Sequence, residues 1–90
     1  MQDRVVIITG GGTGIGRAAA IQFAQAGAWV VVVGRRAAPL EEPASVSDRI
    51  VPVPADLLHE ADLERVIQTA NSRWGRIDVL VKSRGALPRS

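Results

Sequence analysis

The chain contains four short apolar runs, each bounded by glycine, proline or charged residues. They span residues 4–9, 28–33, 50–55 and 77–81. Short β-branched runs that end in turn residues are typical of buried strands. The second run holds four consecutive valines at positions 30–33, which are too apolar for a sheet with one face in water. The pattern therefore predicts four strands, buried on both faces.

Helical periodicity follows the first of these runs. From Gly14 the apolar residues recur on one helical face, which carries Ile15, Ala19, Phe23 and Ala26. Gly27 stands where a glycine that ends a helix belongs. We therefore expect a helix between the first and second strands.

A second amphipathic stretch precedes the last run. Its apolar residues have the spacing i, i+3, i+4, i+7 and i+11, and Gly75 closes it. They are Leu63, Val66, Ile67, Ala70 and Trp74. The segment 35–48, which carries Pro39 and Pro43, is expected to be a loop or at best a short helix.

Strands that alternate with helices predict an α/β protein with a parallel sheet covered on both faces. We expect a Rossmann-type three-layer fold with a partial sheet of about four strands in the order 3-2-1-4. Pro52 and Pro54 cannot donate ladder hydrogen bonds, which places the third strand at a sheet edge.

Composition narrows the class of protein. With 47% hydrophobic and 22% charged residues, the chain is too apolar to be intrinsically disordered. It has no cysteine, and His59 is its one histidine, so neither a disulfide nor a metal site is expected. The apolar runs are far shorter than a membrane span, and the N-terminus does not resemble a signal peptide. We expect a cytoplasmic protein without a membrane partner.

The sequence pI of about 10.4 suggests nucleic-acid binding at first sight. Through Val81, however, the chain has eight basic and nine acidic residues, and Lys82, Arg84 and Arg89 then add charge without any acid. The basicity therefore belongs to the last nine residues and not to a binding face. A small basic nucleic-acid-binding protein is the least favoured alternative.

A glycine-rich turn lies between the first strand and the first helix. Gly10 permits a sharp exit from the strand, Gly14 leaves room for a pyrophosphate, and Gly16 lets the helix lie close to the sheet. A helix N-terminus offers backbone N–H groups to an anion. A turn without a ligand is the alternative, but the strand before and the helix after favour a dinucleotide site.

These residues resemble the glycine motif of the short-chain dehydrogenase/reductase family, Thr-Gly-x-x-x-Gly-x-Gly. The likeness continues in Gly27-Ala28, in Ala55-Asp56-Leu57 and in the segment 75–81. The resemblance implies an NAD(P)-dependent oxidoreductase. It assigns cofactor binding to Gly10, Thr13, Gly14, Ile15, Gly16, Arg35, Asp56 and Leu57.

The second strand ends in Gly34-Arg35-Arg36, where an acidic residue would favour NAD. The resemblance places Arg35 beside the 2′-phosphate of NADP, with Thr13 in support, so we expect NADP as cofactor, with NAD possible. The alternative is that both arginines are solvated. The resemblance gives Asp56 a contact with the exocyclic amine of adenine, beside the Leu57 backbone, and capping of the following helix is the compatible alternative.

The family's Ser, Tyr and Lys catalytic group has no counterpart in this sequence, which contains no tyrosine and a single lysine, Lys82. Where the family has Asn-Asn-Ala-Gly, this chain has Lys82-Ser83-Arg84-Gly85. We expect residues 1–81 to form an NAD(P)-binding half-domain, truncated by a frameshift or early stop, and 82–90 a divergent basic tail.

Two functions remain open from the sequence. The first is the cofactor-binding part of an oxidoreductase that is catalytically incomplete as it stands. The second is a non-catalytic nucleotide-binding or regulatory module that pairs with another chain. Self-association through an exposed sheet edge is expected in either case.

Overall fold

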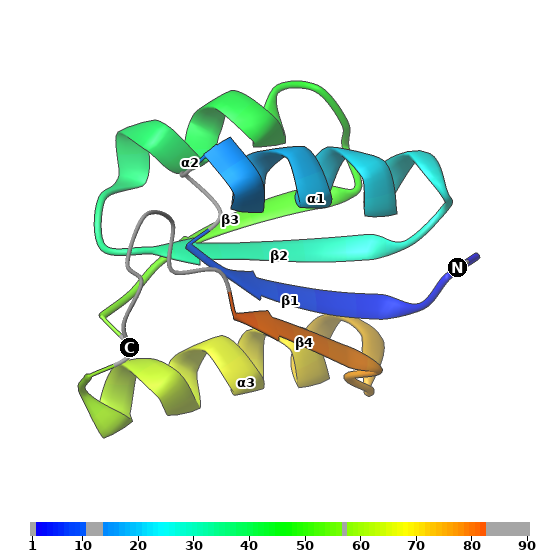
Figure 1. Cartoon of the computed structure of the whole chain (residues 1–90). Helices are drawn as coiled ribbons and strands as arrows, with labels where there is room; N and C mark the ends of the chain where they lie inside the picture. The colour runs from blue at the N-terminus through cyan, green and yellow to red at the C-terminus, as the bar shows by residue number, and fades with distance from the viewer. Residues whose placement is uncertain (1, 11–13, 57, 83–90) are drawn as a thin grey trace.

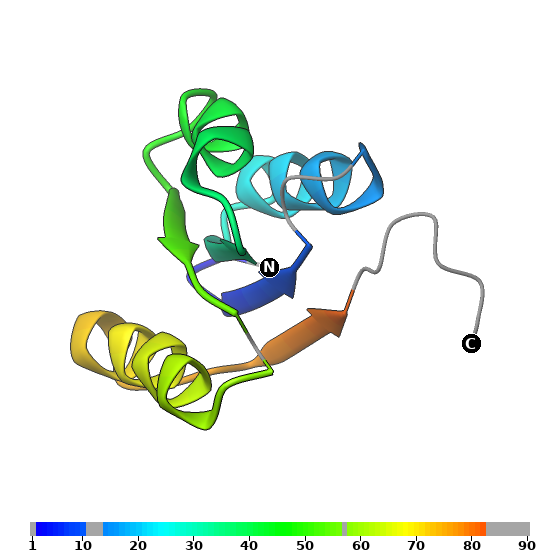
Figure 2. The same cartoon turned by 90° about the vertical axis from the view of Figure 1, so that its left-hand side faces the viewer.

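The computed structural model describes residues 2–10, 14–56 and 58–82. Its elements are β1 (Val5–Thr9), α1 (Gly14–Gln25), β2 (Trp29–Gly34), α2 (Ala37–Ala44), β3 (Ile50–Pro54), α3 (Glu60–Trp74) and β4 (Val79–Lys82). All pairings are parallel, and the strand order is β3-β2-β1-β4, which confirms the predicted order. Helices α1 and α2 cover one face of the sheet and α3 covers the other (Figures 1 and 2).

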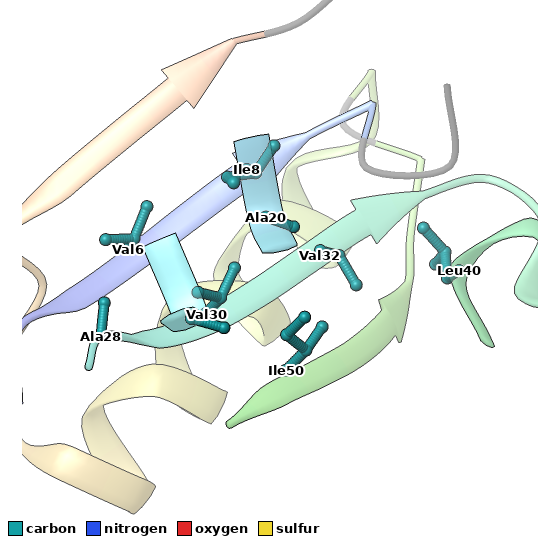
Figure 3. Packing of buried hydrophobic residues seen from close by; sticks show 9 residues of the cluster. Val6, Ile8, Ala20, Ala28, Val30, Val32, Leu40 and Ile50 are labelled. Carbon is teal, nitrogen blue, oxygen red and sulfur yellow. The ribbon is translucent and has the colours of Figure 1, made fainter. Parts of the chain in front are cut away.

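The valine run of β2 supplies both faces of the core. Val30 and Val32 pack with α1 and α2 in a cluster that also contains Val6, Ile8 and Leu40 (Figure 3). Val31 and Val33 face the opposite side, toward α3. Side chains alternate between the faces of a strand, so a run that is apolar at every position requires cover on both. The three-layer prediction is thereby confirmed.

The buried face of α1 is only partly the predicted one, since Ala19 and Phe23 pack against the core as expected but Ile15 and Ala26 do not. Its buried residues are Gly16, Ala20 and Ala24, whereas Ile15 is 69% exposed and Ala26 is exposed as well. Small residues four positions apart let the helix lie close to the sheet, and the larger side chains are then displaced to its flanks. The size of a side chain was therefore a misleading guide to burial in this helix.

Segment 35–48 contains a genuine helix, the eight-residue α2. Pro39 lies in its first turn, where a missing N–H costs no intrahelical hydrogen bond. Pro43 and Leu40 are its buried residues. Of the two structures that the sequence allowed, a loop or a short helix, the segment forms the short helix.

Strand β3 lies at a sheet edge, as its prolines predicted. The Ala55 N–H donates to the Gly34 carbonyl at 2.8 Å. Alternate N–H groups of a strand point in opposite directions, so positions 52 and 54 point away from β2. The two prolines therefore cost the sheet no hydrogen bond.

Charged side chains join β1 to the segment before β4. The Asp78 carboxylate accepts the Val5 N–H at 2.8 Å and an Arg76 Nη2–H at 2.6 Å, and lies 3.6 Å from Arg4. The Arg76 contact, followed by the Val5 N–H, lowers the pKa of Asp78 below its usual range. Asp78 thus fixes the start of β1 beside the last strand.

Two tryptophans join α3 to β2 at the amino ends of the strands. The rings of Trp29 and Trp74 stack with centroids 5.7 Å apart. The Arg49 guanidinium lies 4.3 Å from the centroid of Trp29, and Arg73 lies 5.9 Å from that of Trp74. Both tryptophans serve packing, since both border the core cluster under α3.

Candidate functional site

The candidate site lies at the carboxyl edge of the sheet. There the strands end and all three helices begin, on the left in Figure 1. The strands β1, β2 and β3 follow one another toward one edge of the sheet, and β4 is then added on the other side of β1. Ligands of open α/β sheets bind outside the strand ends at the point where the strand order reverses in this way. The residues predicted from the glycine motif, from Arg35 and from Asp56 all follow strands at this edge.

The first part of the site is the turn after β1. Gly10 has φ 73°, a left-handed conformation that favours glycine, and its N–H donates to the Val33 carbonyl at 2.8 Å. The Thr9 hydroxyl donates to the Val81 carbonyl at 3.4 Å. The turn is therefore anchored to both neighbouring strands. Thr13 lies outside the described residues.

Helix α1 begins at Gly14, where open space takes the place of a side chain. A Cβ built on Gly14 has no atom of the described chain within 4 Å. Gly16, two residues later, is buried against the sheet. The exposed Ile15 side chain completes this first turn. Gly14 is therefore exposed at the N-terminus of α1, and the backbone N–H groups of a helix N-terminus are suited to an anion.

The second part of the site follows β2. Arg35 is exposed and makes no hydrogen bond or ion pair with the residues that the structure describes. A Cβ at Gly34 would approach Leu40 Cδ2 to 3.2 Å, so the strand end is packed tightly against α2. A free guanidinium at this edge can pair with a phosphate.

The third part is Asp56, which is half-buried just after β3. Its Oδ1 accepts the Leu58 N–H at 3.0 Å, and its Oδ2 lies 3.6 Å from His59 Nε2. The residue at the N-cap of α3 is His59, so Asp56 closes the turn ahead of the helix without capping it directly. The Ala55–Gly34 hydrogen bond places Asp56 and Arg35 after neighbouring strand ends. Leu57 lies outside the described residues.

Sequence reasoning gave no role to Asp62 and Arg65. Asp62 Oδ2 accepts the Asp56 N–H at 2.8 Å, and Arg65 Nη2 donates to the Pro54 carbonyl at 2.6 Å. The Asp56 N–H is the main reason why the pKa of Asp62 is lowered. An acidic residue at the third position of a helix, which often bonds backward to the preceding turn, was the available signal.

The described residues offer binding groups and no reactive constellation. No group of three or more His, Asp or Glu side chains in this part of the chain could hold a metal ion. None of the helices in the described ranges is long and apolar enough to cross a membrane. A helix N-terminus, a free guanidinium and a carboxylate along one edge would suit a nucleotide that carries phosphates.

The chain is similar to proteins of one family. The family described as short chain dehydrogenase matches residues 4–90. A 3-hydroxyacyl-CoA dehydrogenase type-2 of Drosophila melanogaster is 35% identical over 86 residues, which cover 94% of this chain and 34% of that protein. An uncharacterized oxidoreductase of Mycobacterium tuberculosis is 36% identical, with coverage of 94% and 34%.

Solved structures give the same result. A 3-ketoacyl-(acyl-carrier-protein) reductase from Brucella melitensis, complexed with NADH, superposes with a TM-score of 0.83 at 39% identity, over 88% of this chain and 33% of that one. A glucose dehydrogenase of Caenorhabditis elegans in the apo form gives 0.85 at 38% identity, over 96% and 39%. The chain thus spans about a third of the length of the relatives it matches.

Proposed function

The chain belongs to the short-chain dehydrogenase family and corresponds to the N-terminal part of its oxidoreductase fold, and on that premise we propose that it binds a nicotinamide dinucleotide at the carboxyl edge of its sheet. The observation that carries this proposal is the first residue of α1, Gly14, where a Cβ would meet none of the described residues beyond its own helix backbone. Backbone N–H groups at that terminus would hold the pyrophosphate. The relatives crystallised with NADH or with a cofactor support the choice of ligand.

The flanking residues extend this assignment to the adenosine half. Asp56 would accept a hydrogen bond from the adenine amine, with Leu57 beside it, and Ile15 would cover the first turn of α1. Arg35 would pair with a 2′-phosphate, so we propose a preference for NADP over NAD. Its free guanidinium and the lack of a carboxylate at Gly34 support that preference.

The proposed role of these ninety residues is cofactor binding and not hydride transfer. The bound dinucleotide supplies hydride chemistry, while proton transfer needs a positioned acid or base. The sequence contains no tyrosine, and its one lysine is Lys82 at the end of β4. We further propose a cytoplasmic setting, which the cysteine-free sequence fits.

Substitution of Gly14 by Val tests the proposed site. The added Cβ meets no atom of the described residues beyond the helix backbone, so we expect the fold to persist while the side chain fills the pyrophosphate position. We expect at least a tenfold loss of NADPH affinity by calorimetry, about 1.4 kcal/mol, with an unchanged far-UV circular dichroism spectrum. Affinity within about twofold of the original chain would place the ligand elsewhere and refute the proposal.

Arg35→Ala tests the cofactor preference. Loss of a charge-assisted contact to the 2′-phosphate should weaken NADPH binding by about 1.5–3 kcal/mol and leave NADH affinity nearly unchanged. Arg73→Ala, another exposed arginine at the opposite end of the sheet, is the matched control. Equal affinities of the original chain for NADPH and NADH would mean that Arg35 is only solvated.

A second candidate function is a non-catalytic module that pairs with another chain. Leu80 of β4 is 55% exposed on the α3 side of the sheet, and Leu63 and Ile67 of α3 are 42% and 39% exposed. These residues and the open β4 edge would support self-association or pairing with a longer relative. Sedimentation that shows a monodisperse monomer at micromolar concentration, with a sharp thermal transition, would exclude this association.

A further inference from the structure

Three backbone groups of residues 54–56, at the exit of β3, are each held by a different partner. The Ala55 N–H donates to β2 through the Gly34 carbonyl. The groups on either side, the Pro54 carbonyl and the Asp56 N–H, are bound by side chains of α3. This exit carries Asp56, so its conformation decides where the Asp56 carboxylate points.

The two side chains come from the first two turns of α3. Asp62 accepts the Asp56 N–H at 2.8 Å, and Arg65 donates to the Pro54 carbonyl at 2.6 Å. Asp62 and Arg65 are three residues apart, so they lie on one face of the helix, and their charged groups are 3.7 Å apart. Both contacts involve an ionised group, the stronger class of hydrogen bond.

We propose that Asp62 and Arg65 form a clamp that positions Asp56 for adenine recognition. This inference rests on the proposed function, since it presumes that an adenine dinucleotide binds at this edge. Asp62 and Arg65 would not touch the ligand, so they are positioning residues. The Asp56 carboxylate is tied to the Leu58 N–H and its backbone to Asp62, so the residue is held at both ends before a ligand arrives.

The affinities for two dinucleotides distinguish a loss of Asp56 positioning from a general loss of stability. The probes are NADPH and its hypoxanthine analogue, in which an oxygen replaces the exocyclic amine that Asp56 would bind. Three variants of the full chain are compared. Asp62→Ala removes the acceptor of the Asp56 N–H, Asp62→Asn keeps an acceptor oxygen without the charge, and the exposed Glu64→Ala on the same helix is the control.

We expect Asp62→Ala to weaken NADPH binding about tenfold and to change the affinity for the hypoxanthine analogue by less than about twofold. Asp62→Asn should recover most of the NADPH affinity, because its amide oxygen can still accept the Asp56 N–H. Amide exchange of Asp56 should be faster in Asp62→Ala than in Glu64→Ala. If Asp62→Ala does not fold, Arg65→Met removes the other half of the clamp and should weaken NADPH binding about threefold.

The outcomes distinguish the two proposals. An original chain that binds neither dinucleotide refutes the proposed function, and with it the role inferred for the clamp. An original chain that binds NADPH while Asp62→Ala binds it equally well refutes the clamp alone. Equal losses for both dinucleotides in Asp62→Ala would show a structural role without any selectivity for adenine, and would also overturn the inference.

Discussion

Truncation of Trp74 to alanine should destabilise the protein, because Trp74 stacks on Trp29 at the amino ends of the strands. Trp74 is half-buried, so about half of the 3–5 kcal/mol that a fully buried Trp→Ala change costs is expected from lost packing. The stack on Trp29 adds about 0.5–1.5 kcal/mol. The expected loss is therefore about 2–4 kcal/mol of the free energy of unfolding.

That loss is large for a chain of this size. A domain of 90 residues has a stability of about 5–13 kcal/mol, and each kcal/mol shifts Tm by about 4–8 °C. Urea unfolding followed by far-UV circular dichroism gives the free energy, and thermal melting gives Tm. Arg73→Ala is the control, because this arginine is exposed and 5.9 Å from the ring, and it should cost less than about 0.5 kcal/mol. A loss below about 1 kcal/mol in Trp74→Ala would show that the stack is only a surface contact.

Three further changes test the turns and the charged contacts. Gly75→Ala should cost about 1–2 kcal/mol in urea unfolding, since φ is 72° and no clash is added. Gly27→Ala should cost more than Gly75→Ala, because φ is 96° and its Cβ would also lie 3.2 Å from Gln2 Cα; equal costs would contradict this. The lowered pKa of Asp78 means that its contribution to stability is complete above the unfolded carboxyl pKa and is lost as pH falls through the folded value. Asp78→Asn should therefore reduce the loss of stability as the pH falls below about 4, and an unchanged acid titration would refute that role.

The sheet could be predicted from the sequence because its signals are local. Four valines in a row demand cover on both faces, and prolines at positions 52 and 54 demand an edge, whatever the rest of the chain does. The face of α1 could not be read in the same way. A periodic pattern finds the apolar residues, but the distance between helix and sheet decides whether Ala20 or Ile15 is buried.

The site was predictable to the extent that it depends on backbone geometry. The left-handed Gly10 and the open position at Gly14 follow from the glycine spacing. Asp62 and Arg65 were missed because their partners are backbone groups of another segment, Pro54 and Asp56. The position of Asp62 in the first turn of α3 suggests a contact with the preceding turn, but residue type and spacing do not identify the backbone partner of Arg65.

The two edges of the sheet differ in a way that limits how copies of the chain could assemble. On β3 the outward positions 52 and 54 are prolines, which remove two N–H donors from that edge. An added strand would find few partners there, whereas the four described residues of β4 include no proline and keep their N–H donors. A subunit that can pair through one sheet edge alone forms a dimer related by a twofold axis. Assembly through the sheet would then end at a dimer, whereas a subunit with two adhesive edges would propagate into a filament.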